Sequence, residues 1–409
     1  MNRRVVVTGL GTINPLGNTV DEFWQNLVNG KNGITFNDRI DTSNFDCKIA
    51  GLVKNFDPYN YIDKKHIRKM DRFVHFGLAS VHQALEDSLI NLSNVDVYRV
   101  GVFVGSGIGG IETFEEQVGV LFSKGNKRIS PYFVPKMIVN ILAGWIGIIY
   151  NIRGPNLTYV SACSSSLHAL GEAYAAVKSG TVDIAIVCGS EAPITPSSIA
   201  GFENMGALSK NNDPQTASRP FDLNRDGFVI AEGAGCIILE SLENASRRES
   251  KIYAEIVGYY HTCDAYHITA PDPGASSIIY AISKAIENID IEEIDYINAH
   301  GTSTPYNDKT ETFAIKSALG ERAYKVNISS TKSMIGHTLG AAGVIESIAT
   351  ILCIYNQTVH PTINYTTPDP ECDLNYTPNK VVHRQINVAL KNSFGFGGHN
   401  VVVAFRKFS

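Results

Sequence analysis

Apolar runs of strand length alternate along the chain with longer stretches of helical length. Residues 99–104, 183–187 and 295–299 are nearly continuous apolar runs, the pattern of strands that are buried on both faces. Residues 167–178 and 340–354 are rich in small and apolar side chains and predict helices. Buried strands that alternate with helices predict an α/β fold in which helices cover both faces of the sheet.

An internal repeat divides the chain into two parts. Residues 161–173 align with residues 330–342, and six of the thirteen aligned positions are identical. Each segment follows a strand-like run and opens a small-residue helix. We interpret this as two related halves rather than a chance match, with Cys163 and Lys332 at equivalent strand-to-helix corners. The two halves are expected to span residues 1–250 and 251–409.

The composition is that of a globular protein with a substantial core. Of the 409 residues, 44% are hydrophobic and 18% are charged, and the formal net charge is −5. A slightly acidic chain gives no support for nucleic-acid binding, which requires a basic domain or stripe. The longest apolar stretch, residues 137–150, is shorter than the about 20 residues of a transmembrane helix, so we predict no membrane partner.

The start of the chain and its cysteines both predict a cytoplasmic location. Arg3 and Arg4 lead directly into the strand-like run 5–7, without the apolar segment of a signal peptide. The seven cysteines are an odd number, are scattered, and include no C-x-x-C pair. This pattern favours reduced thiols over disulfides or a zinc site, so we predict no bound metal.

Cys163 is the strongest candidate for a nucleophile. It lies where a predicted strand gives way to a helix, and the free N–H groups and dipole of that helix would favour a thiolate. Its neighbours Ala162 and Ser164 are small, which would leave the sulfur accessible. Most intracellular cysteines are buried small hydrophobic residues, and Cys188 and Cys236, inside apolar runs, are predicted to be of that kind.

Two histidines and a lysine are candidate partners of this cysteine. His300 follows a predicted buried strand, at the edge of an α/β sheet where ligands bind. His337 lies five residues after Lys332, in the segment equivalent to the one that carries Cys163. A cysteine–histidine hydrolase would use one of the histidines and would leave the other and Lys332 unexplained.

Two glycine-rich segments lack the context of a dinucleotide-binding site. Residues 105–110 match G-x-G-x-x-G after a strand, but no second strand ends in an acidic residue at the required spacing. Residues 9–14 have Asn where the third glycine belongs. Near the C-terminus, residues 392–400 combine glycines with Phe394 and Phe396, which indicates a tight turn, a gate, or a backbone donor near the site.

Taken together, these motifs resemble the β-ketoacyl-acyl-carrier-protein synthases, most closely those of type II. The resemblance covers nearly the whole chain, from residue 4 to residue 405. Its most specific parts are the Cys163 corner, the Asn-Ala-His-Gly-Thr run at 298–302, the run 332–337, and the Asn-Ser-Phe-Gly-Phe-Gly-Gly run at 392–398. The type II character rests on the runs 68–71, 130–135 and 219–228.

The resemblance implies a thiolase-like fold, in which two duplicated α/β halves stack into a five-layer αβαβα arrangement. The first half would carry Cys163, and the second half would carry His300, Lys332 and His337. The resemblance also implies an obligate dimer, either a homodimer or a heterodimer with a chain-length factor.

The resemblance further implies a reaction. An acyl group held as a thioester on Cys163 would be condensed with malonyl-acyl carrier protein, with loss of CO₂. His300 and His337 would donate hydrogen bonds to the developing enolate. No cofactor is implied, because the phosphopantetheine arm of acyl carrier protein brings the substrates.

The resemblance assigns supporting roles to further residues. Lys332, paired with Glu346, would support His337. The backbone N–H groups of Cys163 and Phe396 would form an oxyanion hole. The gate and acyl pocket would be lined by Ile108, Phe202, Phe394 and Phe396. The pantetheine tunnel would be lined by Thr302 and Thr304. The acidic carrier protein would dock on the basic residues Lys65, Arg68, Lys69, Lys127 and Arg128.

Two alternative functions remain within this resemblance. One is the condensing subunit of a type II polyketide synthase, which works with a chain-length-factor partner. The other is a non-catalytic protein like a chain-length factor, which would lack the nucleophile that Cys163 provides. The sequence therefore predicts acyl-chain elongation in fatty acid synthesis, with the polyketide pathway as the first alternative.

Overall fold

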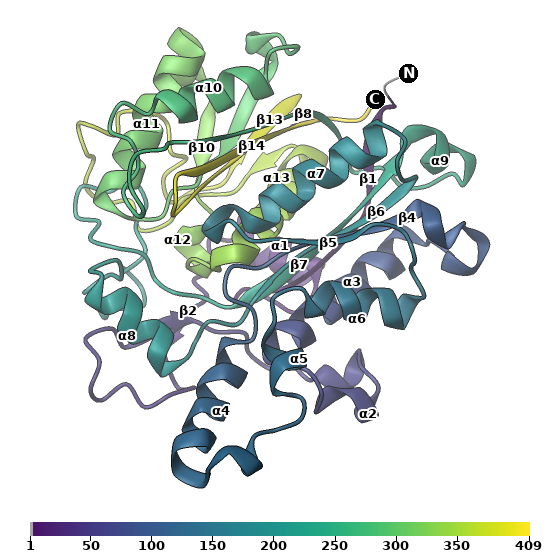
Figure 1. Ribbon diagram of the computed structural model, residues 1–409. Helices are drawn as coiled ribbons and strands as arrows, with labels where there is room; N and C mark the ends of the chain where they lie inside the picture. The colour runs from purple at the N-terminus through teal and green to yellow at the C-terminus, as the bar shows by residue number, and fades with distance from the viewer. Residues whose placement is uncertain (1–2) are drawn as a thin grey trace.

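The computed structural model describes residues 3–409, and its centre is one sheet of ten strands (Figure 1). The strand order across the sheet is β10-β9-β13-β14-β8-β1-β7-β6-β4-β5. The strands span the following residues: β1 Val5–Ile13, β4 Val100–Gly105, β5 Asn156–Tyr159, β6 Ile184–Glu191, β7 Gly233–Ser241, β8 Ala254–Cys263, β9 Ile294–Asn298, β10 Asn327–Ser329, β13 Val388–Gly395 and β14 His399–Arg406. Two small sheets pair β2 Ile34–Phe36 with β3 Ile49–Gly51 and β11 Thr358–Val359 with β12 Val382–His383.

The large sheet contains the same five-strand arrangement twice. The strands of each group can be numbered 1 to 5 in the order in which they occur along the chain. In these numbers, β5-β4-β6-β7-β1 and β10-β9-β13-β14-β8 both read 3-2-4-5-1 across the sheet. In both groups the first two pairs of neighbouring strands are parallel and the last two pairs are antiparallel. The groups join through three antiparallel residue pairs between Val5–Val7 of β1 and Ala254–Ile256 of β8. The repeat in the sequence thus corresponds to a repeated strand topology.

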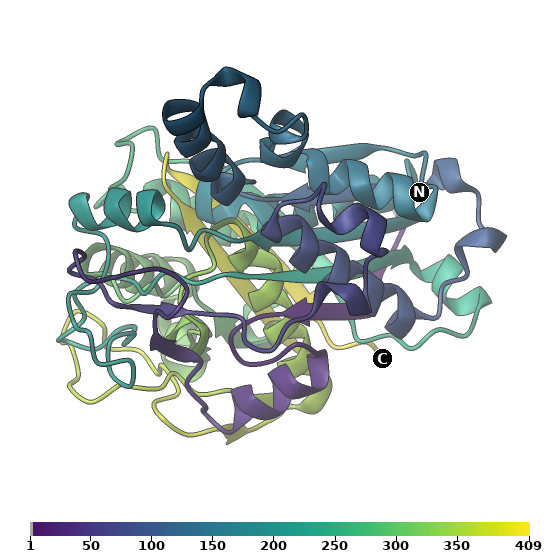
Figure 2. The same ribbon diagram turned by 90° about the horizontal axis from the view of Figure 1, so that it is seen from below.

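Helices form three layers around the two half-sheets, as Figures 1 and 2 show. α3 and α6 cover the outer face of the first half-sheet, and α10, packed on α11, covers that of the second. α7 and α13 pack on each other and on both half-sheets, which makes them the middle layer. The fold is therefore the predicted five-layer αβαβα arrangement. The helices span α1 Val20–Val28, α2 Lys64–Ile67, α3 Arg72–Ser88, α4 Ile111–Lys124, α5 Phe133–Met137, α6 Ile141–Tyr150, α7 Ser165–Lys178, α8 Pro196–Asn204, α9 Leu242–Arg247, α10 Ser276–Ala285, α11 Pro305–Leu319, α12 Lys332–Ile335 and α13 Ala342–Asn356.

The most apolar helical run of the chain lies in the middle layer of the fold. Among residues 3–409, one run, Leu339–Asn356, is long and apolar enough to cross a membrane, and 89% of it is buried inside the structure. Its side chains, such as Val344 and Ile348, belong to the core between the two half-sheets. A largely apolar helix fits such an enclosed position, and its one buried carboxylate, Glu346, is paired with lysines. The run is a core helix of the fold.

Cys163 and Lys332 lie at equivalent corners of the two halves. β5 and β10 are the third strands of their groups, and a short helical turn follows each of them. Cys163 lies in the 3₁₀ turn Ala162–Ser164 ahead of α7, and Lys332 begins α12. His337 does not open a helix, because it lies in an extended segment between α12 and α13 that forms a bridge with Ile230.

Candidate active site

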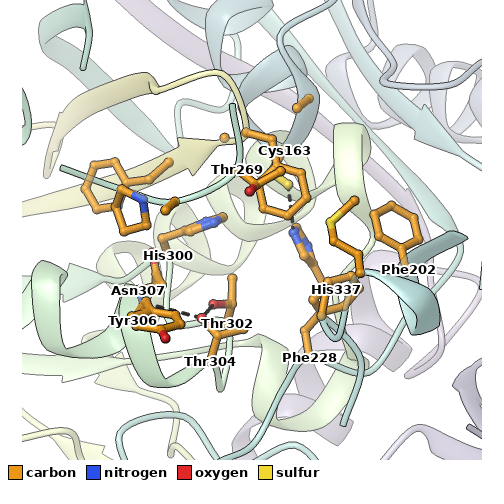
Figure 3. Close-up of a pocket in the computed structure, with 18 of the residues that line it drawn as sticks. Cys163, Phe202, Phe228, Thr269, His300, Thr302, Thr304, Tyr306, Asn307 and His337 are labelled. Atoms are coloured by element: carbon orange, nitrogen blue, oxygen red, sulfur yellow. Dashed lines mark hydrogen bonds between the residues drawn. The ribbon is translucent and has the colours of Figure 1, made fainter. Parts of the chain in front are cut away.

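Three reactive side chains from distant parts of the chain meet where the two halves join (Figure 3). The sulfur of Cys163 and one ring nitrogen each of His300 and His337 lie within 4.8 Å of one another. Sγ of Cys163 is 3.0 Å from Nε2 of His337. The two imidazole rings are 5.6 Å apart at an angle of 83°. The structure thus brings together the cysteine and both histidines that the sequence singles out.

The backbone immediately before Cys163 is strained. The preceding residue, Ala162, has a φ of 50°, in the left-handed region that residues with a side chain rarely adopt. Ser165 holds this corner, because its hydroxyl accepts from the N–H of Ser161 at 2.9 Å and donates to the carbonyl of Ala162 at 2.7 Å. The small residues around the cysteine therefore build the corner itself.

The structure corrects two expectations about Cys163. The residue is only 9% exposed, so its sulfur faces an internal cavity rather than an open helix end. Burial raises the pKa of the thiol to about 12, although the charge of Lys332 and the N–H groups of Phe396 and Cys163 act to lower it. Desolvation outweighs these groups and favours the thiol, against the thiolate that the helix start was expected to favour.

His300 is fixed through its backbone and its ring. The N–H groups of His300 and Gly301 donate to the carboxylate of Glu311, both at 2.8 Å. The Lys332 ammonium donates to the carbonyl of His300 at 2.7 Å and lies 3.5 Å from Nδ1. Because an ammonium can only donate, Nδ1 is the acceptor and the ring proton is on Nε2. His300 therefore has a fixed N–H donor on the other side of its ring.

His337 is held by its backbone, and its ring is less constrained. Gly336 before it has a φ of 75°, and a Cβ there would lie 2.9 Å from the carbonyl oxygen of Val229, so the position requires glycine. The N–H of His337 donates to that same carbonyl at 2.7 Å. Within the described part of the chain, Nδ1 of His337 has no hydrogen-bond partner. Its ring proton can therefore occupy either nitrogen.

Both histidines favour the neutral form at neutral pH. Burial moves the pKa of each ring well below its usual value, and the positive charge of Lys332 acts in the same direction. A neutral imidazole has one N–H donor and one acceptor nitrogen. The site therefore consists of a thiol and two uncharged imidazoles.

A buried ion cluster stands beside the histidines. The predicted ion pair of Lys332 with Glu346 is present at 2.7 Å, and Glu346 also pairs with Lys391 of β13 at 2.7 Å. Besides Glu346, the Lys332 ammonium directly contacts His300, and it acts on His337 through its charge. The spacing of the thiol and imidazoles would suit a metal ion, but two nearby ammonium groups disfavour a cation there.

One cavity of about 420 Å³ opens onto Cys163 and both histidines. Phe202 of α8 packs edge-on against Phe228 in its wall, with ring centroids 5.4 Å apart. The hydroxyl groups of Thr302 and Thr304 in its wall are 2.9 Å apart (Figure 3). The residues predicted for the gate, acyl pocket and pantetheine tunnel all line this cavity: Ile108, Phe202, Phe394, Phe396, Thr302 and Thr304.

The Phe396 segment is the turn between β13 and β14. Gly397 and Gly398 have φ values of 85° and 75°, which glycine adopts without steric cost. The turn brings the N–H of Phe396 to the sulfur of Cys163, where its hydrogen bond lowers the pKa of the thiol. Both a tight turn and a backbone donor, as the sequence indicated, are therefore present.

The sequence analysis missed three buried charged residues beside the site: Glu191, Glu311 and Lys391. Glu191 accepts from the N–H of Gly107 at 2.6 Å and of Gly340 at 3.0 Å, so it ties the two halves together. The glycine-rich run 105–110 therefore binds an internal carboxylate. For Glu191 and Lys391, the available signal was a charged residue within an apolar strand.

The predicted docking residues form two surface groups: Lys65, Arg68 and Lys69 on and after α2, and Lys127 and Arg128 in the 3₁₀ turn after α4. Nζ of Lys69 lies 5.8 Å from the ring centroid of Tyr132, which follows the second group. This contact links the two groups into one surface, which we call the basic surface.

Comparison with known proteins assigns both halves to one family. Residues 2–245 match the family described as beta-ketoacyl synthase, N-terminal domain, and residues 253–366 match beta-ketoacyl synthase, C-terminal domain. The 3-oxoacyl-[acyl-carrier-protein] synthase 2 of Synechocystis sp. is 49% identical, over 99% of this chain and 98% of that protein. The protein of the same name from Staphylococcus aureus is 47% identical, over 100% of this chain and 99% of its own length.

Solved structures show the same similarity in three dimensions. A type II polyketide ketosynthase in complex with its acyl-carrier protein is 38% identical, with a TM-score of 0.93 and both chains covered in full. The ishigamide ketosynthase/chain length factor is 32% identical, with a TM-score of 0.94 and the same coverage. The chain therefore belongs to the β-ketoacyl synthase family, the acyltransferases that form a carbon–carbon bond by Claisen condensation.

Proposed function

We propose that Cys163 carries the acyl group in this condensation and that His300 and His337 stabilise the malonyl-derived enolate. The observation that carries the proposal is the meeting of one thiol and two neutral imidazoles in one cavity. Hydrolysis by a cysteine–histidine pair needs only one imidazole. Two uncharged N–H donors suit a reaction in which negative charge develops on a carbonyl oxygen.

In the acyl-transfer step, Sγ of Cys163 attacks the carbonyl carbon of the acyl thioester. The thiol proton passes to Nε2 of His337, which lies 3.0 Å away. The N–H groups of Cys163 and Phe396 hold the oxyanion of the tetrahedral intermediate. The bond to the pantetheine sulfur then breaks, and that sulfur takes the proton from His337. The unpartnered Nδ1 lets this ring accept a proton here and donate one in the next step.

In the condensation step, the bond between the malonyl methylene carbon and its carboxylate breaks. CO₂ leaves, and the electron pair forms an enolate whose oxygen accepts hydrogen bonds from the Nε2–H groups of His300 and His337. The enolate carbon attacks the acyl carbon on Cys163. The thioester bond to Sγ breaks, and the sulfur takes up one proton from solution, which balances the negative charge that the malonyl carboxylate brought and regenerates the thiol. The product is a 3-oxoacyl-acyl carrier protein that is two carbons longer.

We propose fatty acid elongation as the pathway, with polyketide synthesis as the alternative. Relatives named 3-oxoacyl-[acyl-carrier-protein] synthase 2 are 47–49% identical, whereas the two polyketide-type structures are 32–38% identical. The test is mass spectrometry of the products formed from malonyl-acyl carrier protein and a series of saturated acyl carriers. We expect single two-carbon extensions by this chain alone. Poly-β-ketone products that require an added partner subunit would favour the alternative.

The cavity divides into two regions that fit the two parts of such a substrate. Ile108 and Phe202 belong to one apolar cluster and would contact the acyl chain. The hydroxyls of Thr302 and Thr304 would bind the amide groups of the pantetheine arm. This assignment places the thioester between the two regions, at Cys163.

The basic surface is the proposed docking site of the acidic carrier protein. Reversing Lys65 and Arg68 to Glu is expected to raise the apparent KM for acyl-carrier substrates about tenfold and to flatten their salt dependence, because complementary charges steer docking. Turnover of a short pantetheine thioester should stay the same, since that substrate reaches Cys163 without a docked protein. Steady-state kinetics with both substrates at several salt concentrations measures this.

The matched control reverses Lys284 of α10 and Lys407 near the C-terminus, which lie at the opposite end of the molecule from α2 (Figure 1). It has the same change of net charge and should leave both substrates unaffected. Equal loss of both substrates in the Lys65/Arg68 variant would indicate damage to the fold. No change with either substrate would place the docking site elsewhere.

A homodimer is the proposed assembly, formed along β5. This strand ends the first half-sheet, and Leu157 and Val160 on and after it are 50% and 58% exposed. The equivalent strand β10 is covered, because the N–H of Ile328 donates to the carbonyl of Asn375. An uncovered apolar edge is a template for pairing with another strand. Sedimentation equilibrium should give twice the 44.6 kDa chain mass, and a single species at 44.6 kDa would contradict the proposal.

Three further expectations from the sequence belong to this proposal. Neither a metal nor a cofactor is required, because the condensation is redox-neutral and both substrates arrive on carrier protein. The cytoplasm is the proposed location, in agreement with the reduced cysteines that the sequence predicts. The boundary between the halves is proposed at residue 250, between α9 and β8.

A further inference from the structure

Lys391 is a fully buried lysine that none of the proposed catalytic steps uses. It lies in the middle of β13, paired in register with Asn298 of β9, and its side chain is 0% exposed. Lysine is almost never fully buried unless it is paired, because its ammonium loses its hydration. A residue kept at this cost beside the site is expected to serve the reaction.

The contacts of Lys391 mirror those of Lys332. Each ammonium is 2.7 Å from the carboxylate of Glu346. Lys391 donates to the carbonyl of Ala299 at 3.2 Å, and Lys332 donates to the carbonyl of the next residue, His300, at 2.7 Å. Two consecutive carbonyls directly after β9 are therefore each held by one lysine, and both lysines are anchored on one glutamate.

The cluster has one net positive charge close to both histidines. Two ammonium groups share one carboxylate, and the charge of Lys391 opposes protonation of His300 and of His337. The remaining titratable groups that face this cluster are Glu311 on α11, Cys163 beside His337, and His360 behind Glu346.

We propose that Lys391 is a positioning residue for the condensation: with Lys332 and Glu346 it fixes the segment that follows β9 and keeps His300 and His337 uncharged as hydrogen-bond donors. The inference rests on the proposed function, since it assigns these histidines the task of stabilising the enolate. It extends that function by a second lysine, which acts through the histidines without touching the substrate.

The sign of the pH dependence follows from these charges. Burial lowers the pKa of Lys391 to about 8, although the charge of Glu346 acts to raise it. Below that pH the ammonium keeps its ion pair with Glu346 and its hold on the carbonyl of Ala299. Above that pH the ion pair is lost and the segment that carries His300 is held less firmly, while both histidines stay neutral. CO₂ release by the wild type should therefore fall as the pH rises through about 8.

The test is the variant Lys391→Met, which keeps the length of the side chain and removes its charge. Glu346 retains Lys332 as a partner, so the variant is expected to fold. CO₂ release from malonyl-acyl carrier protein should fall about tenfold at pH 7. The acid limb of the pH profile should move upward by about one pH unit, because loss of a nearby positive charge raises the pKa of the histidines. The alkaline limb near pH 8 should disappear.

The matched control is Lys316→Met, which removes the ammonium of an exposed ion pair with Asp373 on the outer face of α11. Its profile should equal that of the wild type. A Lys391→Met profile with both limbs unmoved would overturn the role of Lys391, even with a lower rate, because a purely structural role lowers activity at every pH. No CO₂ release by the wild type would refute the proposed function itself, and this role with it.

A measurement on the unmodified protein keeps the proposal testable if Lys391→Met does not fold. NMR of the chain labelled with ¹³C at lysine Cε should show one buried lysine that titrates near pH 8. If every lysine signal titrates above about pH 10, the usual range of an exposed lysine, the proposal is overturned.

Discussion

Replacement of Cys163 by alanine is expected to abolish acyl transfer and to lower condensation by about 10⁴-fold or more, because no other group can hold the acyl chain. The loss should be seen as the absence of an acyl adduct by intact-mass spectrometry after incubation with an acyl carrier. The fold should be unaffected, since alanine is smaller than cysteine and the sulfur faces the cavity.

The matched control for this prediction is Cys263→Ala, because Cys263 is an exposed thiol. That variant should form the adduct and turn over normally. Peptide mapping of the acylated protein is required, since simple alkylation would also label the exposed Cys263. An acyl group on Cys263, or condensation retained in Cys163→Ala, would contradict the assignment.

Replacement of His300 by alanine is expected to reduce CO₂ release from malonyl-acyl carrier protein by about 10²–10³-fold, the usual cost of one lost oxyanion donor. Acyl transfer to Cys163 should survive, because His300 takes no part in removing the thiol proton. The two half-reactions are measured separately, by release of labelled CO₂ and by the mass of the acyl-enzyme.

His337→Ala gives the informative comparison. It should slow both half-reactions, since Nε2 of His337 is 3.0 Å from the sulfur and also faces the enolate in the proposed mechanism. His82→Ala, which removes a surface histidine beside Glu86 on α3, is the control and should change neither. Undiminished CO₂ release in both active-site variants would remove the histidines from the mechanism.

The fold and the corner positions were predictable because they depend on local patterns. Buried apolar strands and the repeated segment around Cys163 and Lys332 are visible along the chain, and strand ends gather at one edge of a sheet. The histidines could be placed near the cysteine for the same reason. The motif resemblance then added the order of layers and the lining of the cavity.

The electrostatics could not be predicted, because they depend on depth and on partners from distant strands. The position of Cys163 at a helix start argued for a thiolate, whereas burial raises the pKa of its thiol to about 12. Lys391 is a single charged residue in an apolar strand, and only the structure shows that it shares Glu346 with Lys332. The partner of Lys332, His300, was likewise decided by three-dimensional packing.

A single-turnover chase tests the central claim most directly. The protein is first acylated from an acyl carrier and freed of excess substrate, then mixed with malonyl-acyl carrier protein labelled in its free carboxylate. We predict that the acyl adduct on the Cys163 peptide disappears with the release of one equivalent of labelled CO₂ and the formation of one equivalent of 3-oxoacyl-carrier. Loss of the adduct as free fatty acid, with the label still on the carrier, would show hydrolysis and would contradict the account.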